Sequence, residues 1–366
     1  MDFALPDNVA ANTIYYLNTK VVLASAANWA SPGYEIAWSQ FKVPVASTQE
    51  PVKRAQHGSL TVQEQPTRIQ VKGNQFDVSF NKVTGLIDSW HFNGQKVLET
   101  APKLNVWRAL IDNDIYQTKQ WKPVSNKAYW QQYGLHWLQH RLDDWQYNFD
   151  SNNKKVQVKA QVRVAPPKLA WAIKTVYTYD IFASGDIVVT VNGELVGDVP
   201  ETLPRIGLQM KVPGHFNDVT WYGRGPGEAY IDSREANRIG MWQTTVDQLF
   251  TNYAVPQENG NRHEVNWMSI HGNEVGLIAV GNPQFDFSAH RYNMENIDQA
   301  RHTHELNKMD EIEWNLDYKH HGLGSASCGP DVLEKYKLKA DDFSFSVRFV
   351  PYSSNQDPTH IAKTIL

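Results

Sequence analysis

Apolar and polar residues alternate with a period of two over much of the chain. From Val156 to Val164 apolar side chains alternate with polar ones, and the run from Phe76 to Phe80 follows the same pattern. The segment from Phe343 to Val350 alternates again near the end of the sequence. This period is that of a strand with one buried and one solvated face. The run 186–191 is apolar and β-branched, and the apolar run 275–280 is typical of a buried strand.

Turn signals separate these runs, and helical patterns are few. Asn93-Gly94 and Asn192-Gly193 each follow an apolar stretch and predict turns. His271-Gly272-Asn273 predicts another turn before the 275–280 strand. The best helical segment runs from Ser125, a suitable N-cap, to Arg141, and a shorter one covers 245–250. The pattern therefore predicts an all-β protein built as a large sandwich.

A polar stretch between Val45 and Pro66 lacks a long apolar pattern and is typical of a linker between domains. Only two or three strand-like runs precede it, such as Thr19 to Ala24 and Glu35 to Val43. So few strands cannot enclose an independent core. We therefore expect residues 1–45 to be part of a domain whose remaining strands come from elsewhere. Without those strands, residues 1–45 should not be well ordered.

Composition narrows the function classes. The 366 residues carry a net charge of −4 with interspersed charges, so neither nucleic acid nor an anionic membrane is an expected partner. Cys328 is the single cysteine, and residues 1–6 lack the features of a signal peptide, so we predict a cytoplasmic protein. The 13 Trp and 16 Tyr suit either stacking on sugar rings or a large β-sandwich core.

Two sequence segments could either bind a ligand or only form turns. Asp112-Asn113-Asp114 follows an apolar stretch and could bind a cation or sugar hydroxyls, although Asp and Asn are also common in capped turns. The run 221–230 is rich in glycine but lacks the spacing of a phosphate-binding loop. A tight turn framed by packed aromatic residues is the better interpretation of that run.

Two further clusters contain ionisable residues. Glu258 and Arg262 could line a pocket, and a structural ion pair is the commoner role of such residues. His302 and His304 would share one face of a strand and could form half of a metal site. No second pair with matched Cys, Asp or Glu spacing completes that site, so no metal site is expected in this chain.

Together these runs resemble the carboxyl-terminal region of the β-galactosidases of glycoside hydrolase family two. The order and spacing of five segments carry the resemblance, and fainter similarity extends towards both ends. The segments are Trp107-Arg108 through Asp114; Gly223-Arg224-Gly225-Pro226 with Glu228, Tyr230, Asp232 and Arg234; Pro256-Gln257-Glu258-Asn259-Gly260 with Arg262; His302-Thr303-His304; and Gly322-Leu323-Gly324 with Ser327.

The resemblance implies an architecture. Residues 1–50 would be part of an immunoglobulin-like β-sandwich, residues 51–66 a linker, and residues 67–366 the terminal β-supersandwich domain, related in fold to galactose mutarotases. The fold class is thus expected to be all-β. This division agrees with the pattern of apolar and polar residues, which predicts too few strands for an independent domain before residue 45.

The resemblance also implies that this chain functions together with another polypeptide region, which supplies the catalytic residues. Family members are retaining glycosidases with two carboxylates roughly 5 Å apart, and both lie on a (β/α)₈ barrel upstream of the region resembled here. No catalytic or metal-binding residue is therefore assigned to this chain, and no cofactor is expected in it. Magnesium and sodium are expected in the complete enzyme. The expected partner is a catalytic large subunit, or the upstream region of the same enzyme, in an oligomer that cleaves galactosides such as lactose.

In the family, the terminal domain forms a wall of the active site. By that resemblance Asp112, Asn113 and Asp114 lie at the wall, and the segment 116–123 with Trp121 is a candidate lid. Tyr116 replaces a glycine found in a well-studied member, which predicts a stiffer or differently placed loop. Some relatives place a tryptophan platform after the Gly-Leu-Gly motif. That position falls at Gly329, next to Cys328, so the platform is absent here.

Two other functions fit parts of the sequence. The aromatic content allows a carbohydrate-binding module that acts without a partner chain. The mutarotase-like fold allows an aldose 1-epimerase, in which Glu258 would act with His263, His302 or His304 as the facing acid and base. Binding of long glucans, or catalysis of mutarotation, would distinguish these alternatives from a galactosidase component.

Overall fold

The computed structural model describes residues 9–45, 52–56, 58–118, 122–150, 155–326, 329 and 331–366. The chain forms two compact units: Met1–Arg54 with Thr359–Leu366, and Ala55–Pro358. The carboxyl-terminal residues thus belong to the same unit as the amino-terminal ones. The predicted linker, 51–66, contains two short strands, one in each unit.

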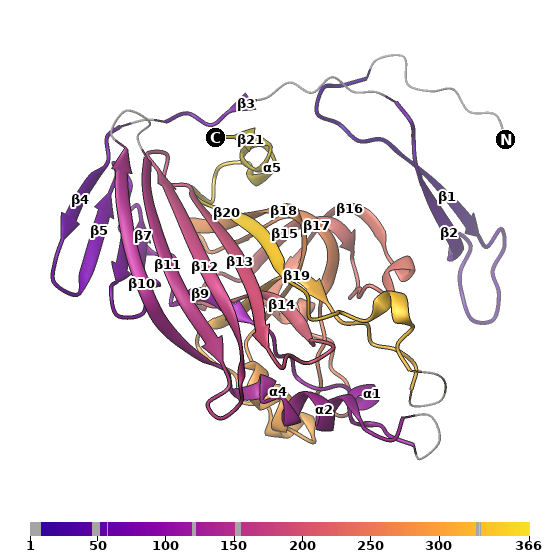
Figure 1. Cartoon of the computed structure of the whole chain (residues 1–366). Helices are drawn as coiled ribbons and strands as arrows, with labels where there is room; N and C mark the ends of the chain where they lie inside the picture. Colours follow the sequence, from indigo (N-terminus) through magenta and orange to yellow (C-terminus); the bar gives the residue numbers. More distant parts are fainter. Residues whose placement is uncertain are drawn as a thin grey trace. The chain divides into compact units, whose positions relative to one another are not determined.

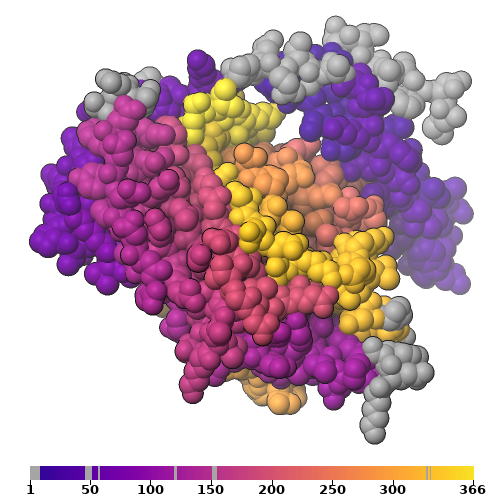
Figure 2. Space-filling model, viewed as in Figure 1, coloured from indigo at the N-terminus to yellow at the C-terminus, as the bar shows by residue number. Residues whose placement is uncertain are grey.

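A twelve-stranded antiparallel sheet dominates the second unit. Its main path runs β10-β11-β12-β13-β20-β18-β17-β15-β16, while β19 pairs with β18 and β14, and β14 also pairs with β9 (Figure 1). The strands are β9 (Thr100–Asn105), β10 (Gln139–Asp150), β11 (Lys155–Ala165), β12 (Trp171–Phe182), β13 (Ile187–Gly197), β14 (Arg205–Val212), β15 (Asp218–Gly225), β16 (Arg238–Thr245), β17 (Arg262–His271), β18 (Val275–His290), β19 (Ile312–His320) and β20 (Phe343–Ser353). The long strands β10 to β13 lie side by side on one face of this unit (Figure 2).

A second, five-stranded sheet has the sequential order β4-β5-β6-β7-β8. The strands are β4 (Thr61–Glu64), β5 (Arg68–Lys72), β6 (Phe76–Asn81), β7 (Ile87–Phe92) and β8 (Gln95–Lys96). Asn93 and Gly94 connect the last two with φ values of 48° and 76°. Two positive φ angles are the requirement of a tight hairpin turn, so the predicted turn is confirmed.

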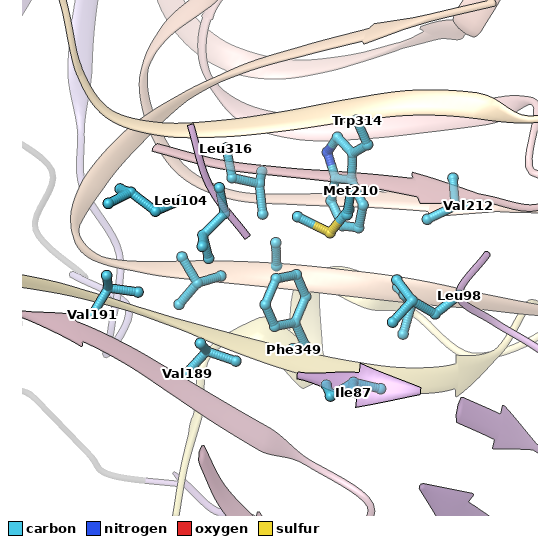
Figure 3. Close-up of a cluster of buried hydrophobic side chains, with 14 of the residues drawn as sticks. Ile87, Leu98, Leu104, Val189, Val191, Met210, Val212, Trp314, Leu316 and Phe349 are labelled. Atoms are coloured by element: carbon cyan, nitrogen blue, oxygen red, sulfur yellow. The ribbon is translucent and has the colours of Figure 1, made fainter. Parts of the chain in front are cut away.

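The alternation seen in the sequence marks the buried face of the sheets. In β11 every second residue from Val156 to Val164 is buried. Apolar side chains from both sheets meet in one core, and Figure 3 shows Ile87 of β7 close to Phe349 of β20. Phe349 is 2% exposed and lies edge-on to Trp90 and Trp314, with ring centroids 6.5 and 5.9 Å away. The all-β prediction is therefore confirmed, with a core that joins two sheets.

The predicted turn at Asn192-Gly193 is wrong, because β13 continues through both residues to Gly197. Asn192 and Gly193 pair with Ser344 and Phe343 of β20. A Cβ atom on Gly193 would lie 2.2 Å from the Phe343 ring. The glycine thus makes room for an aromatic side chain of the neighbouring strand, a demand that a local turn signal does not reveal.

Helices are few, as the sequence predicted, and each is short. They are α1 (Asp112–Ile115), α2 (Asn126–Gln132), α3 (Val246–Leu249), α4 (Met294–Gln299) and α5 (Pro358–Ala362), with 3₁₀ turns η1 (Leu135–Trp137), η2 (Arg234–Ala236), η3 (Thr303–Glu305) and η4 (Glu334–Tyr336). The helix predicted over 125–141 is correct in its start but too long. The Ser125 side chain caps α2, whereas Gly134 has a φ of 69° and a separate 3₁₀ turn follows. In the part of the chain that the structure describes, no helix has the length and apolarity to span a membrane.

The first unit is built on few strands. β1 (Tyr16–Val22) pairs with β2 (Glu35–Lys42) as an antiparallel hairpin, and β3 (Val52–Lys53) pairs in parallel with β21 (Thr364–Ile365). Apolar side chains on and around the hairpin are exposed, among them Trp29 at 66% and Phe41 at 57%. An isolated two-stranded hairpin is marginally stable in water.

Candidate functional site

Arg108 links the run 107–114 to the end of β19. The buried guanidinium donates to the two carboxylate oxygens of Asp114, with Nη2–O distances of 3.0 Å, and to the His321 carbonyl at 2.8 Å. Its Nη1 also lies 3.2 Å from His320 Nδ1. A two-pronged contact of this kind fixes orientation as well as distance. Residues 212 and 213 positions apart in the sequence are thereby held in one rigid arrangement.

Asp114 organises the short helix that carries the acidic run. One of its carboxylate oxygens accepts the Ile111 N–H at 3.2 Å, which completes the first turn of α1, and the other accepts from Asn126 of α2 at 3.2 Å. Asp114 is 1% exposed. The buried carboxylate therefore fixes the geometry of α1 and joins it to α2.

Asn113 connects α1 to the Gly-Leu-Gly segment. Its side-chain amide donates to the carbonyls of Leu323 and Gly324, at 3.1 and 2.8 Å. Gly324, with a φ of 70°, in turn donates its N–H to Asp232 at 2.7 Å. The motifs that contain Asn113, Asp232 and Gly324 thus meet beside α1, which is labelled in Figure 1.

Lys122 is a further link, and sequence reasoning did not identify it. This nearly buried ammonium donates to the Asn113 carbonyl at 2.9 Å and to Asp331 at 3.1 Å. It therefore ties the end of the predicted lid, 116–123, to both α1 and the segment after Gly324. The local sequence around Lys122, between Trp121 and Pro123, carries no signal of this role.

The remaining predicted wall residues have different positions. Asp112 is exposed, and its backbone N–H donates to Gln257 Oε1 at 3.3 Å, so the third motif also reaches this place. Tyr116 is half-buried and ends α1 with a φ of −61°, an angle open to any residue. A Cβ on Gly329 would lie 3.3 Å from the Ser325 carbonyl oxygen. Trp121 and Cys328 lie outside the described residues.

A buried charge network lies behind these loops. Glu258 is 3.8 Å from His320 Nε2 and accepts the Tyr230 hydroxyl at 3.4 Å, and Arg205 forms a buried ion pair with Asp317. Burial opposes ionisation of Glu258, yet the charge of Arg205 and the His320 imidazole outweigh it and hold the Glu258 pKa at about 2. Glu258 is thus a buried anion beside His320, whereas Arg262, the partner suggested by the sequence, donates to the carbonyls of Pro226 and Gly260.

The glycine-rich run 221–230 begins as the last part of β15, and the chain bends only after Gly225, so the predicted turn is correct only for the second half of the run. Arg224 donates to Glu264 at 2.6 Å and to the carbonyls of Arg234 and Asn237, at 3.0 and 2.8 Å. The Arg262 guanidinium lies 5.4 Å from the centre of the Trp221 ring and donates to the Gly260 carbonyl at 2.7 Å. These contacts agree with a turn framed by packed aromatic residues.

The histidines that sequence analysis grouped lie in different places. His302 and His304 are exposed; His304 lies in η3 and His302 directly precedes it, so the predicted strand is wrong. His320 and His321 are buried at the end of β19. Burial and the nearby charge of Arg108 hold the pKa of His321 well below its usual range. The neutral His321 ring accepts the Leu338 N–H at 3.1 Å.

These features define the class of protein: an all-β unit whose loops, gathered at one end of a curved sheet, are held by buried arginine–carboxylate contacts. The model of the β-galactosidase small chain matches residues 72–349. The chain belongs to this family, and the resemblance found in the sequence is confirmed.

Relatives show how much of a longer protein the chain represents. It is 32% identical to a β-galactosidase of Vibrio cholerae over 327 residues, which cover 87% of this chain and 31% of that protein. For the β-galactosidase of Kluyveromyces lactis the identity is 26%, with 92% of this chain and 32% of that protein covered. The chain therefore spans about a third of the length of these curated relatives.

Solved structures with a similar arrangement have low sequence identity. An α-mannosidase from Enterococcus faecalis matches 96% of this chain and 38% of its own length, with a TM-score of 0.49 and 9% identity. A galactose 1-epimerase from Lactobacillus acidophilus matches 82% of this chain and 99% of its own, with a TM-score of 0.41 and 11% identity.

Proposed function

We propose that this chain is the non-catalytic, carboxyl-terminal part of a retaining β-galactosidase, as a small subunit or as a region of a longer enzyme. The observation that supports it is the match to the small-chain family over 72–349, together with coverage of only a third of each relative. The catalytic carboxylates, and the magnesium and sodium expected near them, would then lie on the barrel-bearing part.

The contribution of this chain to catalysis would be positional. The bonds from Asn113 to the 323–324 carbonyls and from Lys122 to Asp331 join two loops into one surface. A rigid wall at the open side of a sugar pocket orients the substrate and excludes water, both of which lower the barrier. Asp112 and Tyr116, which are accessible, are the side chains proposed to face a terminal galactoside.

The hairpin of the first unit is the proposed contact with the catalytic part. β1 and β2 expose Val21, Ile36 and Phe41, at 59%, 54% and 57%. Exposed apolar surface of this kind marks interaction sites in soluble proteins. The strands that cover it would come from the barrel-bearing part of the enzyme.

Reconstitution tests the proposal. Turnover of a chromogenic β-galactoside is measured with the purified chain, with a barrel-bearing chain, and with both mixed. The expected result is activity only in the mixture. Hydrolysis by this chain alone would overturn the proposal. The proposal would also be wrong if adding this chain changed neither the activity of the barrel-bearing chain nor its mass in solution.

A variant pair separates assembly from the wall function. Asn113→Ala should assemble normally and lower kcat/KM at least about tenfold, the scale of a lost orienting contact. The matched control is Asn192→Ala, at an exposed position of the central strand β13, where the only side-chain bond described is that from Ser344. Equal kcat/KM for both variants would show that the loops do not shape the site.

The alternative of an aldose 1-epimerase gains no specific support from the contacts of Glu258. Glu258 is buried beside His320 and Tyr230. Of the histidines suggested as its partner, His263 pairs with Asp286 at 2.7 Å, and His302 and His304 are exposed at η3.

A further inference from the structure

Three potential metal ligands lie together at η3, on the surface of the second unit. His302, His304 and Glu305 each offer one ligand atom, and these atoms all lie within 4.8 Å of one another. His302 Nδ1 is 3.1 Å from Glu305 Oε1, and the two imidazoles stack with centroids 5.4 Å apart and an interplanar angle of 20°. The sequence offered only the two histidines, because their expected strand would have turned Glu305 to the opposite face.

The backbone that presents these side chains is held on both sides. The second carboxylate oxygen of Glu305 accepts the Arg301 N–H at 2.8 Å, which leaves Oε1 directed at His302. Asn296 of α4 donates to the Glu305 carbonyl at 3.1 Å and accepts the Asn307 N–H at 2.7 Å. The ligand-bearing turn is therefore anchored to a helix, which lowers the entropic cost of gathering three ligands.

The donor set determines the kind of cation. Two imidazoles and one carboxylate suit Zn²⁺ and its neighbours in the first transition row, and zinc binds three such ligands with a water in the fourth position. Mg²⁺ and Ca²⁺ prefer oxygen ligands, so they are poor candidates here. Exposure of all three side chains leaves the remaining positions open to water.

We propose that His302, His304 and Glu305 form a binding site for one divalent transition-metal ion of the zinc type. All three ligands lie in the segment 302–305, which Asn296 joins to α4. The α4 carboxylate of Asp298 accepts the Leu110 N–H at 2.7 Å, so the site is connected to the start of the acidic run. This site belongs to the chain itself and is independent of any catalytic partner.

Titration of the chelator-treated chain with Zn²⁺ tests the proposal. Calorimetry should give one site per chain, and Co²⁺ in its place should produce visible absorption bands that differ from those of aqueous Co²⁺. Mg²⁺ at the same concentration should give no heat. Absence of a saturable Zn²⁺ site would overturn the proposal.

Variants distinguish this site from general surface binding. His304→Ala and Glu305→Gln should each weaken Zn²⁺ binding more than about tenfold, since even groups that only orient metal ligands contribute tenfold or more. His360→Ala, at an exposed histidine elsewhere, is the matched control and should leave affinity unchanged. Unchanged binding in the first two variants would mean that the metal binds adventitiously and would overturn the assignment. Circular dichroism of each variant without metal checks that the fold is retained.

Discussion

The two units of this chain differ in how they use apolar residues. In the second unit two sheets bury a continuous core that includes Ile87, Trp314 and Phe349. In the first unit a single hairpin exposes Trp29 and Phe41. Burial of apolar surface is the main driving force of folding, so the second unit has the means to fold alone. The first unit has apolar side chains of the right kind but too few strands to cover them.

The largest expected effect is loss of a core ring in the second unit. Phe349→Ala removes a side chain that contacts Trp90 and Trp314 from both sheets. We expect the free energy of unfolding to fall by about 3–5 kcal/mol, the usual cost of such a cavity. Urea unfolding followed by tryptophan fluorescence measures it. A change below about 1 kcal/mol would show that the sheets do not depend on a shared core.

Removal of the buried arginine should have an effect nearly as large. Arg108→Met leaves Asp114 buried without its cation, and breaking a buried pair costs about 3–5 kcal/mol. The same change should release α1. When Arg108→Met and Phe349→Ala are compared under conditions that give them the same unfolding free energy, proteolysis near residues 112–118 should be faster in Arg108→Met. Identical cleavage patterns in the two variants would contradict a specific role of Arg108 in holding these loops.

A pH-dependent effect of intermediate size is expected at Glu313. Burial, together with the nearby charge of Glu295, raises the pKa of Glu313 to about 7. Because the folded value lies above the unfolded one near 4.5, this group costs stability as the pH rises from about 4.5 to 7. Glu313→Gln should therefore gain on the order of 1–3 kcal/mol relative to wild type at pH 8, and much less at pH 4.5. Exposed Glu194→Gln is the control, and a pH-independent difference would contradict the assignment.

The smallest effect on the isolated chain is expected in the hairpin. Phe41→Asp replaces a side chain that is 57% exposed, so the unfolding free energy should change by less than about 0.5 kcal/mol. The same variant should fail to assemble with a barrel-bearing chain, because a charge would enter the covered apolar surface. Size-exclusion chromatography of the mixture measures assembly, and normal complex formation would argue against the proposed contact.

Local patterns predicted the strands well, because burial on one face leaves a period of two in the sequence. The 156–164 run and the Asn93-Gly94 turn follow directly from that rule. Prediction failed where a partner strand decides the outcome. Gly193 lies within β13 because the Phe343 ring lies across it, and Phe343 is 150 residues away in the sequence.

The motifs of the candidate site could be found in the sequence, but their arrangement could not. Resemblance to a family identified the runs around Asp112, Glu258 and Gly324 in the correct order. The bond from Asn113 to the Gly324 carbonyl spans 211 residues, and no local spacing encodes such a contact. Lys122 and Glu305 were missed for a similar reason, since their partners are set by the fold.

Hydrogen–deuterium exchange of the backbone amides, alone and with a barrel-bearing chain, tests the central contrast most directly. The amides of β12 and β13 should exchange slowly in both samples, because they lie inside a large sheet. Those of β1 and β2 should exchange quickly in the isolated chain and become protected on mixing. Equal, strong protection of β1 and β2 in the isolated chain would contradict the account, since the first unit would then need no partner.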